Sequence, residues 1–182
     1  AFLNMAYEVL SDAGQNAGNG DASKWIEVIR IVSHASGCQG MLEGQARDLA
    51  YEGTPISASR LQRLHHLKTG ALIEAAVHCG AVIANGNEYQ INGLRQFARK
   101  VGLAFQVTDD ILNVTGDPAI MGKAVGSDAE RGKNTYPTLM GLEASRQFAA
   151  DLTADALQAL DIFDNKADPL RAIAAYIIDR NR

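Results

Sequence analysis

Residues 102–113, GLAFQVTDDILN, place two neighbouring carboxylates within a segment that is otherwise mostly apolar. The polar residues are three or four positions apart, so on a helix they form one narrow stripe, made up of Gln106, Asp109, Asp110, Asn113 and the following Asp117. A helix that is apolar around most of its circumference is normally buried. Carboxylates are rarely buried without a partner. We therefore predict that this stripe faces an internal cavity that holds cations.

The rest of the chain is also predicted to be helical. Four prolines, an aromatic content of 6% and the lack of alternating Val, Ile and Thr runs disfavour a β-sheet. Turns rich in Gly and Asn separate the helix-spaced apolar segments, and Ser57 is a candidate N-cap. The expected helices span residues 1–13, 21–34, 41–51, 58–68, 71–84, 88–114, 137–160 and 169–180. Residues 1–182 are therefore expected to form a single all-α unit of packed helices.

The composition narrows the classes of function. A net charge of −4 over 182 residues, with no cluster of Lys and Arg, gives no basis for nucleic-acid binding. The most apolar window, residues 71–84, is too short for a membrane span and contains Glu74 and His78. Cys38 and Cys79 lie in apolar helical stretches, so we expect two buried, reduced thiols, as in a cytoplasmic protein.

Two basic segments accompany the carboxylate stripe. Lys68-Thr69-Gly70 lies at a predicted helix junction, and the loop 122–137 carries Lys123 and Lys133 among several glycines. Clustered carboxylates attract Mg²⁺, which prefers oxygen ligands, and lysines opposite them suit a metal-bridged polyanion such as a diphosphate. The glycines let the loop close over a ligand, although its spacing is not that of a Walker phosphate loop.

Each feature taken alone also has a purely structural interpretation. An Asp-Asp pair is common on exposed helices, Lys68 with Thr69 fits an ordinary helix end, and loop lysines are usually solvated. His65 and His66 are adjacent, so on a helix they point in different directions. We expect them to be an exposed pair and not a metal chelate.

In combination, these segments resemble the trans-isoprenyl diphosphate synthases, in particular the bacterial farnesyl and geranylgeranyl diphosphate synthases. Several separate motifs that agree in order and spacing are far more specific than any one of them. They extend across essentially the whole chain and read Gly44-Gln45-Ala46-x-Asp48-Leu49, Lys68-Thr69-Gly70, Phe105-Gln106-x-x-Asp109-Asp110-Ile111-Leu112, Gly122-Lys123-x-x-Gly126-x-Asp128, Gly132-Lys133-x-Thr135-Tyr136-Pro137 and Tyr176-Ile177-Ile178-Asp179-Arg180.

This resemblance implies an isoprenoid-synthase-type helical bundle around a central cavity, usually assembled as a homodimer. It also implies head-to-tail condensation of isopentenyl diphosphate with an allylic diphosphate, from dimethylallyl or geranyl to farnesyl or on to geranylgeranyl diphosphate. In such enzymes Mg²⁺ ions bridge two aspartate-rich motifs and the allylic diphosphate, and they stabilise the leaving oxygen as an allylic carbocation forms. The implied partners are these diphosphates, with neither nucleic acid nor stable membrane insertion.

The resemblance also assigns roles to individual residues. The metal-binding positions of the second aspartate-rich motif correspond to Asp109, Asp110 and Asn113. The contacts to the allylic diphosphate correspond to Lys68, Lys123 and Lys133. The implied catalytic group consists of Lys68, Thr69 and Gln106. In this group the dipoles of Thr69 and Gln106 steady the carbocation or the leaving group, while Gln45 and Asp48 line or brace the cavity.

Two departures from the family pattern matter. Asn113 stands where the second motif usually ends in Asp, so weaker metal affinity is expected there. The first aspartate-rich motif does not occur in this sequence, and its place in the family lies upstream of the residue that matches Ala1. Residues 1–10 also read as a helix entered partway along, without an initiator Met or a cap. We therefore interpret the chain as an incomplete synthase domain whose N-terminal helices are missing, and expect it to be inactive as a separate polypeptide.

The main alternative is a non-catalytic subunit that keeps the fold and pairs with an active partner. Asn113 and the missing motif favour it, whereas the retained lysines and Asp109 count against it, because a scaffold has no physical need for them. A terpene cyclase of similar fold fits less well, since Lys68-Thr69 and the lysine-bearing loop resemble chain-elongating enzymes.

Overall fold

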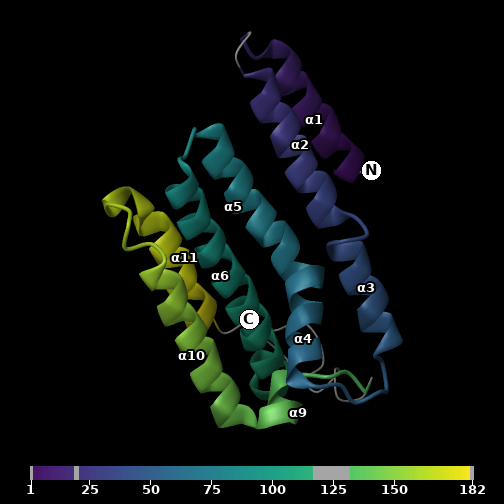
Figure 1. Ribbon diagram of the computed structural model, residues 1–182. Coiled ribbons are helices and arrows are strands. Elements are labelled where there is room, and N and C mark those ends of the chain that lie inside the picture. The colour runs from purple at the N-terminus through teal and green to yellow at the C-terminus, as the bar shows by residue number, and fades with distance from the viewer. Residues whose placement is uncertain (1, 19–20, 117–131, 181–182) are drawn as a thin grey trace.

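The computed structural model describes residues 2–18, 21–116 and 132–180. Within these ranges the regular secondary structure is entirely helical, which confirms the predicted all-α class (Figure 1). The helices are α1 (Phe2–Asn16), α2 (Ala22–Ser36), α3 (Met41–Ala50), α4 (Ala58–His65), the π-helical turn η1 (His66–Gly70), α5 (Ala71–Ile83), α6 (Glu88–Thr115), α9 (Tyr136–Met140), α10 (Leu142–Gln158), the 3₁₀ turn η2 (Asn165–Ala167) and α11 (Asp168–Asp179).

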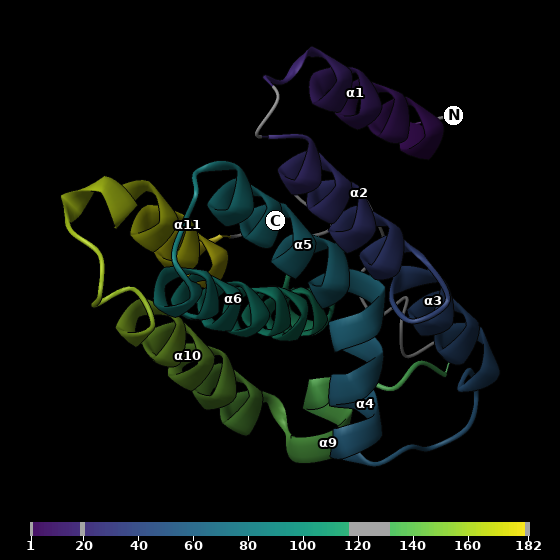
Figure 2. The same ribbon diagram turned by 45° about the horizontal axis from the view of Figure 1, so that its top comes forward.

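The long helix α6 is the centre of the fold. It packs against α5 on one side and against α10 and α11 on another, as both ribbon views show (Figures 1 and 2). Ala98, Ala104 and Val107 of α6 are fully buried, so the predicted burial of this helix is confirmed. Burying one such Val side chain stabilises the fold by roughly 1.5–3 kcal/mol. The main core joins α6 to α10 and α11 through Phe97, Val101, Leu152, Ala156, Leu160, Ala174 and Ile177.

The helix ends follow their sequence signals. The Ser57 side chain caps α4 by accepting a hydrogen bond from the Arg60 backbone N–H, as predicted. Asn87 and Gln90 form a reciprocal capping box at the start of α6. Thr135 and Thr138 form another at the start of α9. These caps fix where α6 and α9 begin, and both helices contribute to the site described below.

Helices α3, η1 and α6 approach one another closely because glycines face their neighbours. A Cβ added to Gly44 of α3 would lie 2.3 Å from the backbone N of Lys68 in η1. A Cβ added to Gly102 of α6 would lie 3.2 Å from the Cα of Gly70. The two glycines therefore bring the backbone around Lys68 and Thr69 against both helices.

Helices α1 and α2 lie at the end of the fold away from α9 (Figure 2). Helix α2 packs on α5 through a small cluster that includes Val28, Ile31 and Cys79. The predicted burial of Cys79 is confirmed, but that of Cys38 is wrong, because this thiol lies exposed in the turn after α2. None of the helices in the described ranges is both long and apolar enough to cross a bilayer.

Glu74 ties α5 to α6. Its carboxylate is buried and accepts hydrogen bonds of 2.8 Å from Arg95 Nε and from Arg99 Nε. Burial acts to raise the pKa of this carboxyl. The hydrogen bonds and charges of Arg99 and Arg95 outweigh that effect and hold the pKa below its usual value of 4.5.

We expect Glu74→Gln to lower the free energy of unfolding at pH 7 by about 1 kcal/mol, since the partly exposed arginines leave the pair screened by solvent. A carboxyl whose pKa is depressed by folding stabilises the protein above its unfolded-state pKa. That contribution is lost as the pH falls through the folded-state pKa. Urea unfolding at pH 7 and in acid should therefore show a wild-type advantage that shrinks on acidification. An advantage of constant size would contradict this account.

Candidate functional site

The Lys68-Thr69 pair lies on η1, the π-helical turn between α4 and α5. A π turn contains one residue more than an α turn allows, and such turns often mark functional positions. Lys68 Nζ donates to Asp48 Oδ2 of α3 at 2.5 Å, and both side chains are partly buried. The structure thus pairs Lys68 with Asp48, a residue that the family resemblance predicts to line or brace the cavity.

A chain of hydrogen bonds connects η1 to α6 and α9. Thr69 Oγ1 donates to Gln106 Oε1 at 3.0 Å, and Gln106 Nε2 approaches Asp110 Oδ1 at 3.5 Å. Asp110 Oδ2 accepts from the Tyr136 backbone N–H at 3.0 Å. The predicted catalytic pair Thr69 and Gln106 is therefore in direct contact, and Asp110 holds the first residue of α9.

Asp109 and Asp110 diverge although they are neighbours in sequence. Asp110 is 4% exposed and points into the protein, whereas the Asp109 side chain is 38% exposed. Arg180, which follows α11, donates to an Asp109 oxygen and, at 2.9 Å, to the Phe105 carbonyl. Its guanidinium lies over the Phe105 ring at 4.1 Å. The expected single stripe is thus divided into an accessible carboxylate and a buried one.

The prediction that His65 is exposed is wrong, because this residue is only 6% exposed. Its Nε2 lies 3.6 Å from Asp110 Oδ2, and its ring stacks on Tyr136 with centroids 5.7 Å apart. Burial, with the Asp110 carboxylate nearby, raises the pKa of the Tyr136 phenol above its usual value. The ring of Tyr136 covers His65, a long-range contact that local spacing does not reveal.

Lys133 and Asp48 line the same recess between α3, α4 and the segment before α9. Asn134 fixes this segment, because its Oδ1 accepts from the Ile56 N–H at 3.1 Å and its Nδ2 donates to the carbonyls of Tyr51 and Thr54. Sequence reasoning missed Asn134. The only local signal was an amide beside a helix cap, so its three distant partners could not be foreseen. Lys123, predicted to contact the diphosphate, lies outside the described residues.

The metal-binding capacity of the described residues is partial. They contain no group of three or more His, Cys, Asp or Glu side chains arranged to hold an ion. The Asp109 carboxylate is the more exposed one but is paired with Arg180, the Asp110 carboxylate accepts from the Tyr136 N–H, and Asn113 is 3% exposed. Because Mg²⁺ requires several oxygen ligands, the described residues do not form a complete magnesium site by themselves.

Comparison with known proteins places these features in a family. The sequence model of the polyprenyl synthetase family matches residues 1–169. The chain belongs to this family. The chain is 44% identical to the farnesyl diphosphate synthase of Escherichia coli K12 and 38% identical to geranylgeranyl pyrophosphate synthase 4 of Arabidopsis thaliana. In both alignments the whole chain is matched, but it spans only 62% and 48% of those proteins.

Solved polyprenyl synthetase structures agree with the helical arrangement. A putative farnesyl-diphosphate synthase from Marinomonas sp. MED121 superposes with a TM-score of 0.81 at 35% identity, over 97% of this chain and 59% of that one. The geranyltransferase from Helicobacter pylori, crystallised with magnesium and isoprenyl diphosphate, gives a TM-score of 0.79 at 33% identity, over 97% and 56%. The resemblance inferred from the motifs is thus confirmed for the family and for the fold.

Proposed function

We propose that the protein to which these residues belong is a short-chain isoprenyl diphosphate synthase. It would join isopentenyl diphosphate head to tail to an allylic diphosphate, forming farnesyl or geranylgeranyl diphosphate. The observation that carries the proposal is the hydrogen bond from Thr69 to Gln106, because it joins the lysine-bearing turn η1 to the helix that carries Asp109. Side chains from two distant segments thereby gather where the family motifs predict a shared site.

Each residue has a role that follows from its chemistry. Lys68 and Lys133 would bind the negatively charged diphosphate, with Lys68 exchanging its contact to Asp48 for the substrate. The Thr69 hydroxyl and the Gln106 amide are fixed by one another, so their dipoles would be preorganised towards the charge that develops as the allylic C–O bond breaks. Magnesium, when bound, supplies Lewis-acid stabilisation of the leaving diphosphate. On this chain Asp109 would help to hold it, together with groups outside the described residues.

The decisive experiment is a prenyl-transfer assay on the whole protein with isopentenyl diphosphate and either dimethylallyl or geranyl diphosphate, with and without Mg²⁺. We expect Mg²⁺-dependent product formation, and at least a tenfold lower kcat/KM for Lys68→Gln, because a charged hydrogen bond to the substrate is lost. Lys166→Gln, on the exposed turn η2, is the matched control and should be unchanged. No turnover with any allylic substrate would refute the proposal.

A non-catalytic subunit of the same fold remains the second candidate. The observation that favours it is Asn113, which provides an amide where the family pattern has a carboxylate, together with the small number of available donors among the described residues. Mg²⁺-dependent binding of a diphosphate, measured calorimetrically on the whole protein, separates the two. Binding supports the enzyme, and its absence together with stimulation of an active partner supports the scaffold.

We also propose that the protein forms a homodimer through α1. This helix buries none of its residues, and it exposes Phe2, Leu3, Met5 and Val9 to solvent. Apolar side chains grouped in this way mark interaction surfaces. Sedimentation equilibrium should give twice the monomer mass for the whole protein, and Val9→Glu should shift it to the monomer. A wild-type monomer at micromolar concentration would refute the dimer.

A further inference from the structure

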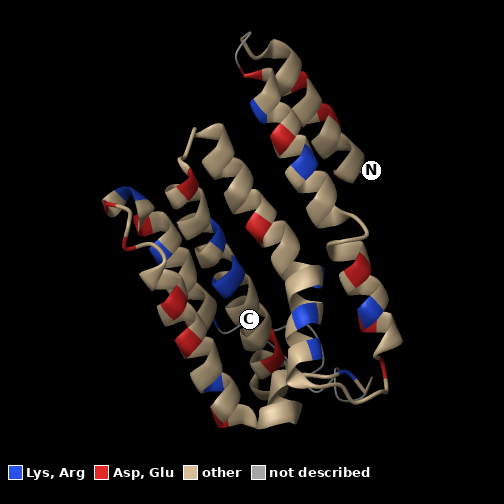
Figure 3. Cartoon of the chain, viewed as in Figure 1, with Lys and Arg blue, Asp and Glu red and all other residues tan. Residues whose placement is uncertain are grey.

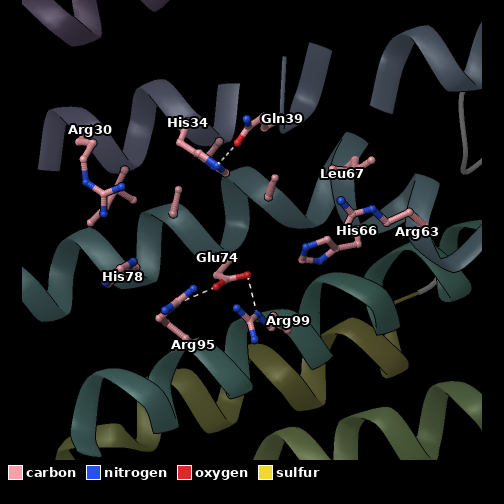
Figure 4. Close-up of a pocket in the computed structure, with 14 residues that line it drawn as sticks. Arg30, His34, Gln39, Arg63, His66, Leu67, Glu74, His78, Arg95 and Arg99 are labelled. Carbon is pink, nitrogen blue, oxygen red and sulfur yellow. Dashed lines mark hydrogen bonds and ion pairs between the residues drawn. The ribbon is translucent and has the colours of Figure 1, made fainter. Parts of the chain in front are cut away.

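A second cavity, of about 310 Å³, lies between α2, α5 and α6 and extends to the end of α4 (Figure 4). That volume is within the range of small-molecule sites. The cavity is separate from the site described above, because its lining contains none of the residues Asp48, Lys68, Thr69, Gln106 and Asp109.

The lining of this cavity carries an excess of positive charge. The lining contains one carboxylate, that of Glu74, and four arginines, namely Arg30, Arg63, Arg95 and Arg99. Figure 3 shows the basic residues of α4 and α6 on facing elements. Glu74 is shared between two of these arginines, so it neutralises at most half of that pair. The cavity therefore has a net positive charge.

The remaining two arginines differ in their surroundings. Arg30 forms a bidentate pair with Glu27, with distances of 2.8 and 2.6 Å, and this carboxylate does not line the cavity. The guanidinium of Arg63 makes no hydrogen bond or ion pair with any residue of the described ranges. The guanidinium of Arg63 is thus open to an anion from solvent. A planar guanidinium binds phosphate oxygens in a bidentate manner.

His66 and His78 add little positive charge to that of the arginines at neutral pH. Burial lowers the pKa of His66, and the charges of Arg63 and Arg99 lower it further against the opposing effect of Glu74. Burial likewise lowers the pKa of His78, with Arg95 adding to the effect. His34 is fixed by a 2.8 Å hydrogen bond to Gln39. Neutral imidazoles can donate one hydrogen bond each to an anion.

The cavity also has an apolar wall. Small and aliphatic side chains of α2, η1 and α5 form it, namely Ile31, Ala35, Leu67, Ala71 and Ala75. A ligand that fits both walls has an anionic head that meets the arginines and a small organic part that lies against the aliphatic surface.

We propose that this cavity binds a small diphosphate anion, with the guanidinium groups of Arg63, Arg95 and Arg99 around its phosphate oxygens. The diphosphate group is common to inorganic diphosphate and to a diphosphate monoester of a short apolar alcohol. The site is independent of the proposed prenyl transfer, and it holds whether or not the site around Lys68 and Gln106 is catalytic.

Calorimetric titration of the protein without divalent metal ions tests this site, with inorganic diphosphate and isopentenyl diphosphate as the probes. We expect Arg63→Gln and Arg99→Gln each to weaken binding about tenfold, as for loss of a charged hydrogen bond. Glu74→Gln should strengthen binding, because it removes the competing carboxylate from two arginines. Lys100→Gln is the matched control, since Lys100 follows Arg99 but pairs with Asp155 of α10. Circular dichroism would verify that each variant is folded.

The outcomes separate the possibilities. If isopentenyl diphosphate binds more tightly than inorganic diphosphate, the apolar wall contacts the organic part of the ligand. If the two probes bind equally, the cavity is a site for inorganic diphosphate. Binding that survives Arg63→Gln and Arg99→Gln but disappears in Lys68→Gln would overturn the proposal, because it would place all bound anion at the site around Lys68. Absence of metal-free binding to the wild-type protein would also overturn it.

Discussion

Replacing Asp109 with asparagine is expected to lower kcat of prenyl transfer in the whole protein about a hundredfold while leaving the fold intact. Asp109 is the more accessible of the two adjacent carboxylates on α6, since its neighbour Asp110 is buried and bound to the Tyr136 N–H. Losing a metal-binding carboxylate removes several kcal/mol of stabilisation of the charge on the leaving group, and each 1.36 kcal/mol corresponds to about tenfold in rate. Raising the Mg²⁺ concentration should restore part of the activity of Asp109→Asn.

Two further variants separate the effect of losing the Asp109 carboxylate as a metal ligand from the other effects of the substitution. Asp109→Asn also loses its ion pair with Arg180, so Arg180→Gln reports the effect of that pair alone. Asp155→Asn makes the same chemical change at an exposed position on α10 and should leave kcat within twofold. If Asp109→Asn has full activity, or if Arg180→Gln reproduces its loss, Asp109 is not the metal-binding carboxylate.

Much of the fold could be predicted from the sequence because its signals are local. The apolar spacing in residues 88–114 predicts a buried helix, and α6 spans Glu88–Thr115. Ser57 caps α4 as expected, because an N-cap needs only a backbone N–H three residues away. The interruption expected near Lys68-Thr69-Gly70 is a π turn and not a break, since α4 and α5 continue through η1.

The directions in which the predicted site residues point could not be predicted from the sequence. Asp109 and Asp110 lie about 100° apart on a helix, so only the position of α9 and of Arg180 decides which carboxylate is buried. His65 is buried for the same reason, because Tyr136 of α9 stacks on its ring. These contacts join segments far apart in sequence, so they cannot be inferred from local periodicity.

Gly44→Ala is expected to have the largest effect on stability. The added Cβ would lie 2.3 Å from the backbone N and 2.5 Å from the Cα of Lys68, and neither atom can move without shifting η1. Helix α3 would have to move away, at a cost of about 2–3 kcal/mol in the free energy of unfolding, or roughly 5–10 °C in Tm. The same shift would separate Asp48 from Lys68, so kcat/KM should fall together with Tm.

Gly80→Ala is the matched control for this substitution. Gly80 also lies within a helix, but an added Cβ would meet nothing within 4 Å. Alanine favours the helix by about 0.5–1 kcal/mol over glycine, so Gly80→Ala should raise Tm slightly and leave activity unchanged. Thermal melts and assays of the two variants side by side test the close contact between α3 and η1. Equal Tm values would mean that α3 and η1 do not touch at Gly44, and Lys68 would then not be positioned by that contact.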